Sequence, residues 1–164
     1  MIDFRNLPRA LWRLMKLPRI WYALGFGPVV GQVILLLTTT GRKSGLRRVT
    51  PLQYEEKNGV FYVASARGQQ ADWFRNIVAD PHVAVQVKAG RWRGLAEPIA
   101  EPARIADFLE LRLRRHPHMF GAMLRGEGLP ARPTRAQLEQ FAEKIAVVAI
   151  RPCEVKLSCK EGET

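Results

Sequence analysis

The stretch TTTGRKSGLRRVTPLQY, residues 38–54, gathers basic and hydroxyl side chains around one short turn bracketed by Gly41 and Gly45. Its cationic and hydroxyl residues include Thr38, Arg42, Lys43, Ser44, Arg47, Arg48 and Thr50. Backbone N–H groups in a glycine turn can form an anion-binding concavity. Arginine binds phosphate or carboxylate through paired N–H donors. These residue types predict a site for a polyanionic ligand.

A second set of candidate residues follows the third expected strand, where the chain reads SARG. These residues are Ser65, Ala66 and Arg67, and the next short helix adds Trp73, Phe74 and Asn76. If the second and third strands pair, Arg67 lies at the same end of the sheet as the basic turn. An ordinary solvated hairpin is the alternative interpretation. The recurrence of a cation at Arg67, together with the glycines and hydroxyls, favours a binding site.

The composition describes a basic chain of single-domain size. Its 164 residues carry 26 basic and 15 acidic side chains, for a net charge of +11, and 47% are hydrophobic. We expect one domain over residues 1–164, with residues 1–28 as a helical lead-in and 158–164 as a loose tail. Such a charge predicts an anionic partner. No helix-turn-helix, zinc-finger or RNP pattern is present, so we do not expect nucleic acid to be that partner.

Patterns that would place reactive groups on the protein itself are missing. His82, His116 and His118 have no metal-ligand spacing, so no metal site is expected. The turn lacks the spacing of a phosphate-binding Walker loop, and no nucleophile elbow occurs. If the protein is an enzyme, we expect a cofactor to supply the reactive group and the protein to bind and orient it.

The elements that must position these residues follow from periodicity and turn signals. Strands are expected over residues 33–39, 48–56, 60–66, 82–88, 91–96 and 146–150. Helices are expected over residues 7–22, from a cap at Asp72 to residue 80, and over 102–115, 119–125 and 134–144, the last opened by a Thr134–Gln137 capping box. Tight turns between consecutive strands indicate antiparallel pairing. The predicted fold is α+β: a small, partly open antiparallel barrel with outer helices.

The N-terminal segment from Leu7 to Tyr22 is basic and amphipathic, and two interpretations stay open. It packs across the domain, or it rests on a membrane surface. We expect a cytoplasmic protein, with peripheral contact at the inner face of the membrane as the alternative. Cys153 and Cys159 form no CxxC pair, so unpaired thiols are expected.

Three of these stretches resemble one family: LLLTTTGRKSGLRRVTPLQY, VASARG and DWFRNIVADPHVAVQV. They are similar to the deazaflavin-dependent nitroreductases, split-barrel reductases that use coenzyme F420. The resemblance implies a split β-barrel and hydride delivery to a planar acceptor such as a quinone, an enone or a nitro compound. It implies a clamp for the phosphate and glutamate tail of the coenzyme. The cofactor-binding residues so implied are Leu36, Leu37, Thr38, Arg42, Lys43, Ser44, Gly45, Arg47, Arg48, Thr50, Pro51, Ser65, Ala66, Arg67, Trp73, Phe74 and Asn76.

The chain departs from the nitroimidazole-activating members at two places. Ala66 stands where those members carry serine, and His116, Met119 and Phe120 stand where they place tyrosines over the substrate. These three residues are the candidate acceptor pocket, and the departures favour a quinone or an enone over a nitroimidazole. Two alternatives remain at this point: a related barrel enzyme that binds FMN, and a non-enzymatic domain that binds lipid or a membrane surface. The oligomeric state is left open.

Overall fold

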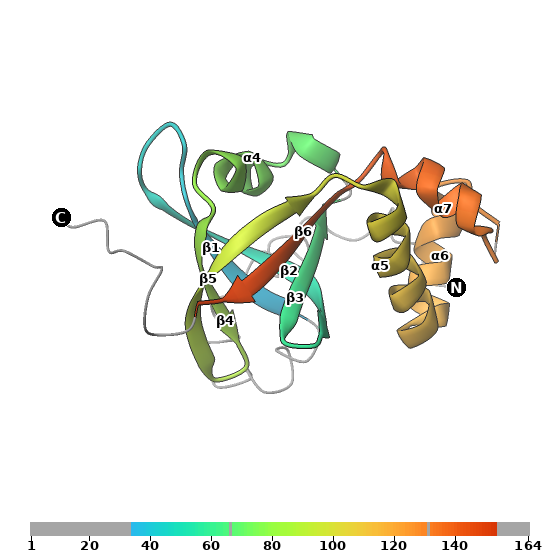
Figure 1. Ribbon diagram of the computed structural model, residues 1–164, viewed down its shortest axis with the longest axis horizontal. Coiled ribbons are helices and arrows are strands. Elements are labelled where there is room, and N and C mark those ends of the chain that lie inside the picture. Colours follow the sequence, from blue (N-terminus) through green and yellow to red (C-terminus); the bar gives the residue numbers. More distant parts are fainter. Residues whose placement is uncertain (1–33, 66, 131, 154–164) are drawn as a thin grey trace, which may run out of the picture.

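The computed structural model describes residues 34–153 apart from residues 66 and 131 (Figure 1). Within this part of the chain, six strands close into an antiparallel barrel in the order β1-β2-β3-β6-β5-β4. The strands are β1 (Ile34–Thr40), β2 (Arg47–Lys57), β3 (Val60–Ser65), β4 (His82–Val87), β5 (Gly90–Ile99) and β6 (Ala146–Pro152). The helices are the short 3-10 helix η2 (Gly68–Gln70), α4 (Asp72–Ala79), α5 (Pro102–Arg115), α6 (Pro117–Gly126) and α7 (Arg135–Ala142).

The expected α+β barrel with outer helices is confirmed, and each expected strand occurs with its ends shifted by a few residues at most. The ring of strands is closed, where the sequence pattern predicted a partly open one. The amphipathic helix expected over residues 7–22 lies outside the described residues.

Two of the tight turns expected between consecutive strands join β1 to β2 and β2 to β3. In the β1–β2 turn, the N–H of Gly41 donates to the carbonyl of Leu46 over 2.8 Å, and Gly45 has φ +66°. In the β2–β3 turn, Asn58 and Gly59 have φ of 54° and 75°. Such left-handed conformations are easiest for glycine and asparagine. The local sequence therefore sets the register in which these strands pair.

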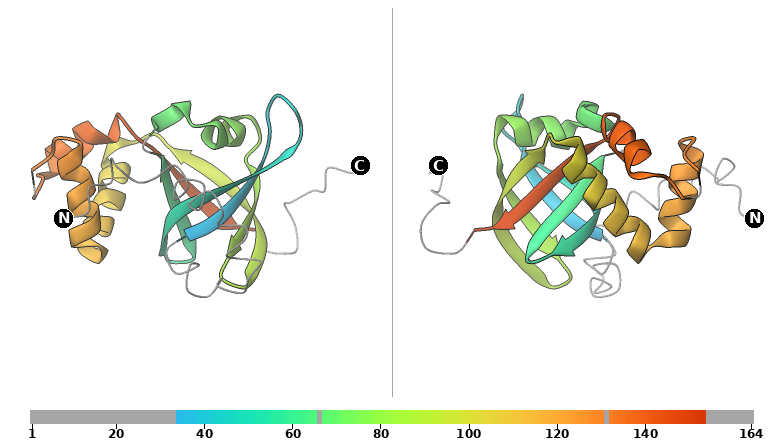
Figure 2. Two further views of the ribbon diagram at one scale, coloured as in Figure 1. Left: turned by 180° about the vertical axis from the view of Figure 1, so that it is seen from behind. Right: turned by 45° about the vertical axis from the view of Figure 1, so that its right-hand side comes forward.

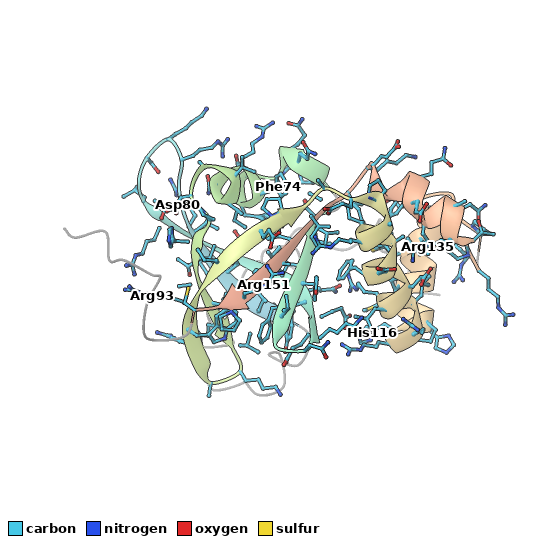
Figure 3. The ribbon with its side chains drawn as sticks, viewed as in Figure 1. Phe74, Asp80, Arg93, His116, Arg135 and Arg151 are labelled. Atoms are coloured by element: carbon cyan, nitrogen blue, oxygen red, sulfur yellow. The ribbon has the colours of Figure 1, made fainter. Side chains whose placement is uncertain are left out.

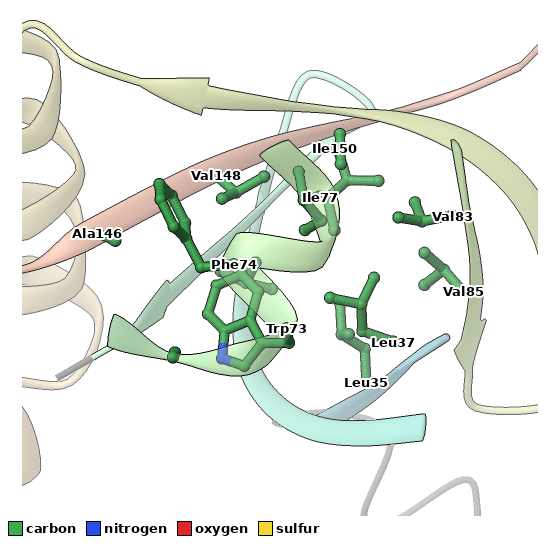
Figure 4. Close-up of a cluster of buried hydrophobic side chains, with 13 residues drawn as sticks. Leu35, Leu37, Trp73, Phe74, Ile77, Val83, Val85, Ala146, Val148 and Ile150 are labelled. Carbon is green, nitrogen blue, oxygen red and sulfur yellow. The ribbon is translucent and has the colours of Figure 1, made fainter. Parts of the chain in front are cut away.

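Helix α4 covers one end of the barrel and contributes to its core (Figures 1 and 4). Trp73, Phe74 and Ile77 are at most 8% exposed. They belong to the same buried cluster as Leu35 and Leu37 of β1, which are fully buried. Successive side chains of a strand point to opposite faces, so Leu36 and Thr38 point away from this core.

Asp72 was expected to cap α4, and this prediction is wrong. The N-cap position is Ala71, which makes no side-chain capping bond, and Asp72 is the first helical residue. The Asp72 carboxylate instead forms an ion pair with Arg42 across a 3.1 Å distance. This carboxylate therefore binds the arginine of the neighbouring turn.

Helices α5, α6 and α7 pack against the outside of the barrel on one side, as the two further views show (Figure 2). A second buried cluster joins Phe108 and Leu109 of α5 with Phe120 of α6, Leu138 of α7 and Val147 of β6. The capping box expected at the start of α7 is confirmed in both of its bonds. This helical layer and the outer face of β2 and β3 enclose the space described below.

Two further observations concern the ends of the described region. Cys153, just after β6, is disulfide-bonded, so the prediction of an unpaired thiol is wrong at this residue. None of the helices between residues 34 and 153 has the length and apolar character that a membrane crossing requires.

Candidate functional site

The basic turn is fastened to α4 through Arg42 and Asn76. The backbone N–H of Arg42 and its Nη1 each donate to Asn76 Oδ1 over 3.2 Å. Its Nη2 pairs with Asp72 at 3.1 Å. Asn76 is buried, and its Nδ2 donates to Thr39 Oγ1 of β1 over 3.1 Å. Arg42 and Asn76 were both predicted to bind cofactor, and here they tie the turn to the helix.

The other cations of the turn are directed toward solvent. Lys43, Arg47 and Arg48 are exposed, and within the described residues none of them forms an ion pair. Ser44 Oγ accepts the N–H of Leu46 over 3.4 Å and so helps to close the turn. Three cations are therefore available to an anionic ligand on this hairpin.

The second set of predicted residues lies at the same end of the barrel, as expected. Arg67 follows β3, is exposed, and donates its backbone N–H to Ser65 Oγ over 3.2 Å. Helix η2 and α4 then lead from Arg67 across the barrel end to the basic turn (Figure 1). Trp73 and Phe74 face the barrel core, so their side chains are largely withdrawn from this surface. Ala66 lies outside the described residues.

The predicted residues of β1 divide between two faces. Leu37 is fully buried in the barrel. Leu36 and Thr38 face outward and line a groove of about 440 Å³ over β1, β2, β4 and β5. Arg47, Arg91 and Arg93 line the same groove, so its rim is basic. Arg93 is labelled on this side of the barrel in Figure 3.

A second cavity, of about 270 Å³, lies between the outer face of β2 and β3 and the three packed helices. Its lining is mainly apolar and consists of Pro51, Leu52, Gln53, Ala64, Ser65, Phe108, Leu109, Arg112, Phe120, Met123, Glu127, Phe141, Lys144 and Ile145. Pro51 and Ser65, predicted to lie by the cofactor, and Phe120, predicted for the acceptor pocket, meet here. Thr50 precedes this lining in β2 and is half-buried.

The other two residues of the predicted acceptor pocket do not line this cavity. His116 turns toward the barrel, where its Nε2 lies 3.2 Å from Glu55 Oε1 (Figure 3). Met119 is 48% exposed on α6. Met123, one helical turn later, supplies the sulfur-bearing side chain of the cavity instead. Phe120 and Met123 are three residues apart and so share a helix face, and this is the face of α6 that meets the cavity.

A buried charge cluster beside the cavity was missed in the sequence. Glu55 of β2 is 4% exposed and lies 3.4 Å from Arg112 Nε and 3.0 Å from Arg115 Nη1. Arg112 Nη2 donates to Gln53 Oε1 over 2.7 Å. Burial lowers the pKa of the Arg112 guanidinium from its ordinary value, and the Glu55 carboxylate partly opposes this. One signal was present: Arg112 follows Phe108 and Leu109 at helical spacing on the buried face of α5.

Comparison with known proteins identifies the family. The family model described as F420H(2)-dependent quinone reductase matches residues 25–121, more than half of the chain. The chain belongs to this family. A relative named "Putative F420H(2)-dependent quinone reductase Rv3178" from Mycobacterium tuberculosis is 42% identical over 60 residues. That match covers 35% of this chain and 50% of the relative, so the chain spans about half the length of the curated relative it matches.

Solved structures support the fold. A protein from Bacteroides thetaiotaomicron, named "putative 5-nitroimidazole antibiotic resistance protein", superimposes with a TM-score of 0.55 at 12% identity, covering 76% of each chain. The conserved hypothetical protein Rv2991 of Mycobacterium tuberculosis gives a TM-score of 0.54 at 17% identity, covering 77% of each chain. At these identities the likeness concerns the barrel alone. The family membership implies reduced coenzyme F420 as the cofactor.

Proposed function

We propose that this protein is an oxidoreductase that uses reduced coenzyme F420 to reduce a planar acceptor, with quinones as the first class to test. The coenzyme supplies a hydride, and the protein binds and orients the two reactants. One observation carries the proposal: three exposed cations on the β1–β2 hairpin lead along β2 into an apolar cavity. The match of residues 25–121 to the quinone reductase family supports it.

The dimensions of β2 suit an extended ligand with one anionic and one planar end. A strand rises about 3.3 Å per residue, so Arg47 and Pro51 stand roughly 13 Å apart along β2. Lys43, Arg47 and Arg48 would hold the phosphate and carboxylates of the coenzyme tail. Pro51 and Ser65 would lie beside the ring at the mouth of the cavity. FMN has no glutamate tail and would leave most of these cations unused.

The test is a binding titration with coenzyme F420 and, in parallel, FMN, each repeated at higher salt. We expect F420 to bind more tightly than FMN and to weaken as salt rises, because screening reduces exposed charge contacts. Charge-assisted hydrogen bonds contribute about 1.5–3 kcal/mol each. The Lys43→Ala/Arg47→Ala double variant should therefore lose at least about tenfold in F420 affinity.

A matched control removes the same charge elsewhere. Lys57 ends β2, ten residues beyond Arg47, and Arg104 is exposed on α5. The Lys57→Ala/Arg104→Ala double variant should bind F420 as the wild type does. Equal losses in both double variants would mean that net charge alone matters, and no loss in the first would remove the clamp. Turnover with a quinone then tests the acceptor class.

We also propose that residues 7–22 contact the membrane surface. The basic amphipathic pattern of this segment supports the proposal, and the segment lies outside the described residues. Its test is co-sedimentation with vesicles containing anionic lipid. Binding that survives in the Lys43→Ala/Arg47→Ala variant would separate this segment from the basic turn. An absence of binding to such vesicles would remove the proposal.

A further inference from the structure

The cavity beside α5 contains a buried cation to which the proposed function gives no role. The Arg112 side chain is 8% exposed, and it lines the cavity together with Phe108 and Phe120. The other charged lining residues, Glu127 and Lys144, are exposed at its edge. Arg112 is therefore the only buried charged side chain among the described residues that line this cavity.

The local charges around Arg112 do not cancel. The single Glu55 carboxylate faces two guanidinium groups, Arg112 at 3.4 Å and Arg115 at 3.0 Å, and the imidazole of His116 at 3.2 Å. The cluster thus carries at least one positive charge in excess. Arg115 is 44% exposed and is stabilised by solvent. The Arg112 side chain is enclosed, and the one carboxylate beside it is shared with Arg115 and His116.

The Arg112 guanidinium also has N–H groups that make no hydrogen bond to a described residue. Its one side-chain hydrogen bond to a described residue runs from Nη2 to Gln53, while its buried Nε lies 3.4 Å from Glu55 Oε1 and forms an ion pair without a hydrogen bond. Its guanidinium instead lies over two aromatic rings, 4.7 Å from the centroid of Phe120 and 5.9 Å from that of Phe108. Buried donors usually have acceptors. An arginine held by aromatic faces with free N–H groups is suited to an oxygen that arrives with a ligand.

We propose that Arg112 is a catalytic residue whose guanidinium binds the acceptor oxygen on which negative charge develops, and that Glu55 is a positioning residue that holds Arg112 in place. This inference rests on the proposed function. It also narrows the substrate class to planar rings with a conjugated carbonyl, such as quinones and enones.

Hydride transfer to a conjugated carbonyl compound places negative charge on the carbonyl oxygen, and a nearby cation stabilises that charge. As the acceptor receives a hydride from the reduced coenzyme, a C–H bond forms at a conjugated carbon. The π electrons shift, and the pair of the C=O bond comes to rest on oxygen. A proton from solvent then neutralises this oxyanion, and the acceptor has gained two electrons and two hydrogens. A fixed cation in an enclosed, mainly apolar cavity stabilises the oxyanion more than water would.

The first experiment uses the full-length protein without any coenzyme, and 4-nitrophenol as the probe. Absorbance reports the fraction of phenolate as pH is varied, with the protein present in excess. An adjacent cation favours the charged form of an acid by about 1–3 pH units. We expect the bound phenol to ionise at least about one unit lower on the wild type than in free solution.

Three variants test whether Arg112 causes that shift. Arg112→Met should abolish it, while Arg112→Lys should retain part of it because the charge remains. Arg114→Met removes an exposed arginine from the same helix and should leave the shift unchanged. In Arg112→Met the Glu55 carboxylate keeps Arg115 and His116 as partners, so we expect the variant to fold, as thermal unfolding would verify.

A full shift in the folded Arg112→Met variant would overturn the proposal, and so would the lack of a shift on the wild type. Titration of the same proteins with coenzyme F420 keeps the two proposals separate, because Arg112→Met should bind the coenzyme like the wild type. A lack of coenzyme binding by the wild type would refute the proposed function but would not alter the phenol result. With coenzyme bound, Arg112→Met should lower kcat by about 100-fold, as loss of an oxyanion donor does.

Discussion

The basic turn and the Glu55 cluster are both rich in arginine, but the ion pair in the turn is exposed to solvent and the one in the cluster is buried. In the turn, the Asp72 side chain that pairs with Arg42 is 83% exposed. In the cluster, the Glu55 side chain that pairs with Arg112 is 4% exposed. Exposed ion pairs contribute little to stability, whereas breaking a buried pair leaves an uncompensated charge. The turn is therefore free to serve a ligand, while removal of the Glu55 charge from the cluster should destabilise the protein.

The largest effect should come from breaking the buried pair. Glu55→Gln keeps the shape of the side chain but leaves Arg112 enclosed without a counter-charge. We expect the free energy of unfolding to fall by about 3 kcal/mol or more, measured by urea denaturation at neutral pH. The matched variant Asp72→Asn, in the exposed pair, should cost less than about 1 kcal/mol. Similar losses in the two variants would contradict the contrast between the regions.

A smaller effect should come from the anchor of the turn. Asn76→Ala removes two bonds accepted from Arg42 and one donated to Thr39. At about 1 kcal/mol for each hydrogen bond, we expect a loss of roughly 2–3 kcal/mol and a several-fold drop in coenzyme affinity as the turn loses its attachment.

Gln69→Ala, at an exposed position of the adjacent η2, is the control and should change neither quantity. If Asn76→Ala lost stability but bound the coenzyme normally, the attachment to α4 would be irrelevant to the clamp. Calorimetry and the F420 titration described above measure the two effects independently.

The smallest effect on stability should come from Asp80, the C-cap residue of α4, whose side chain is partly exposed. Partial burial raises its pKa, but bonds from the backbone N–H and ring of His82 act in the other direction, and the net pKa lies below its ordinary value. A lowered folded-state pKa stabilises the protein above the unfolded-state pKa and ceases to do so as pH falls through the folded-state value.

Asp80→Asn should therefore cost at most about 0.5 kcal/mol at neutral pH, and the difference from wild type should be smaller at a second, acidic pH below the ordinary aspartate pKa of about 4. Urea denaturation at the two pH values measures it. A difference that grows on acidification would show that the sign of the pKa shift is wrong. Such a result would also contradict the expectation that the exposed ion pairs of this chain contribute little to stability.

Local sequence patterns were enough to predict the strands and helices of the described region. Alternating valines at Val83 and Val85 indicated β4, the Asn58-Gly59 pair indicated the second hairpin, and Thr134 with Gln137 indicated the start of α7. Each of these signals acts within a few residues of the chain, where propensity and turn geometry dominate. The Asp72 cap failed because its partner, Arg42, is thirty residues away.

The sequence by itself determined the basic turn, the antiparallel β2–β3 hairpin that brings Arg67 to the same barrel end, and the stretches on which the family resemblance rests. Only the tertiary structure decided which cations are free: Arg42 is bound to α4, whereas Lys43 and Arg47 are not. Only the tertiary structure placed Arg112 beside Glu55, 57 residues earlier in the chain. The physical reason is that burial and pairing of charge depend on the packing of α5 against β2, which no local pattern specifies.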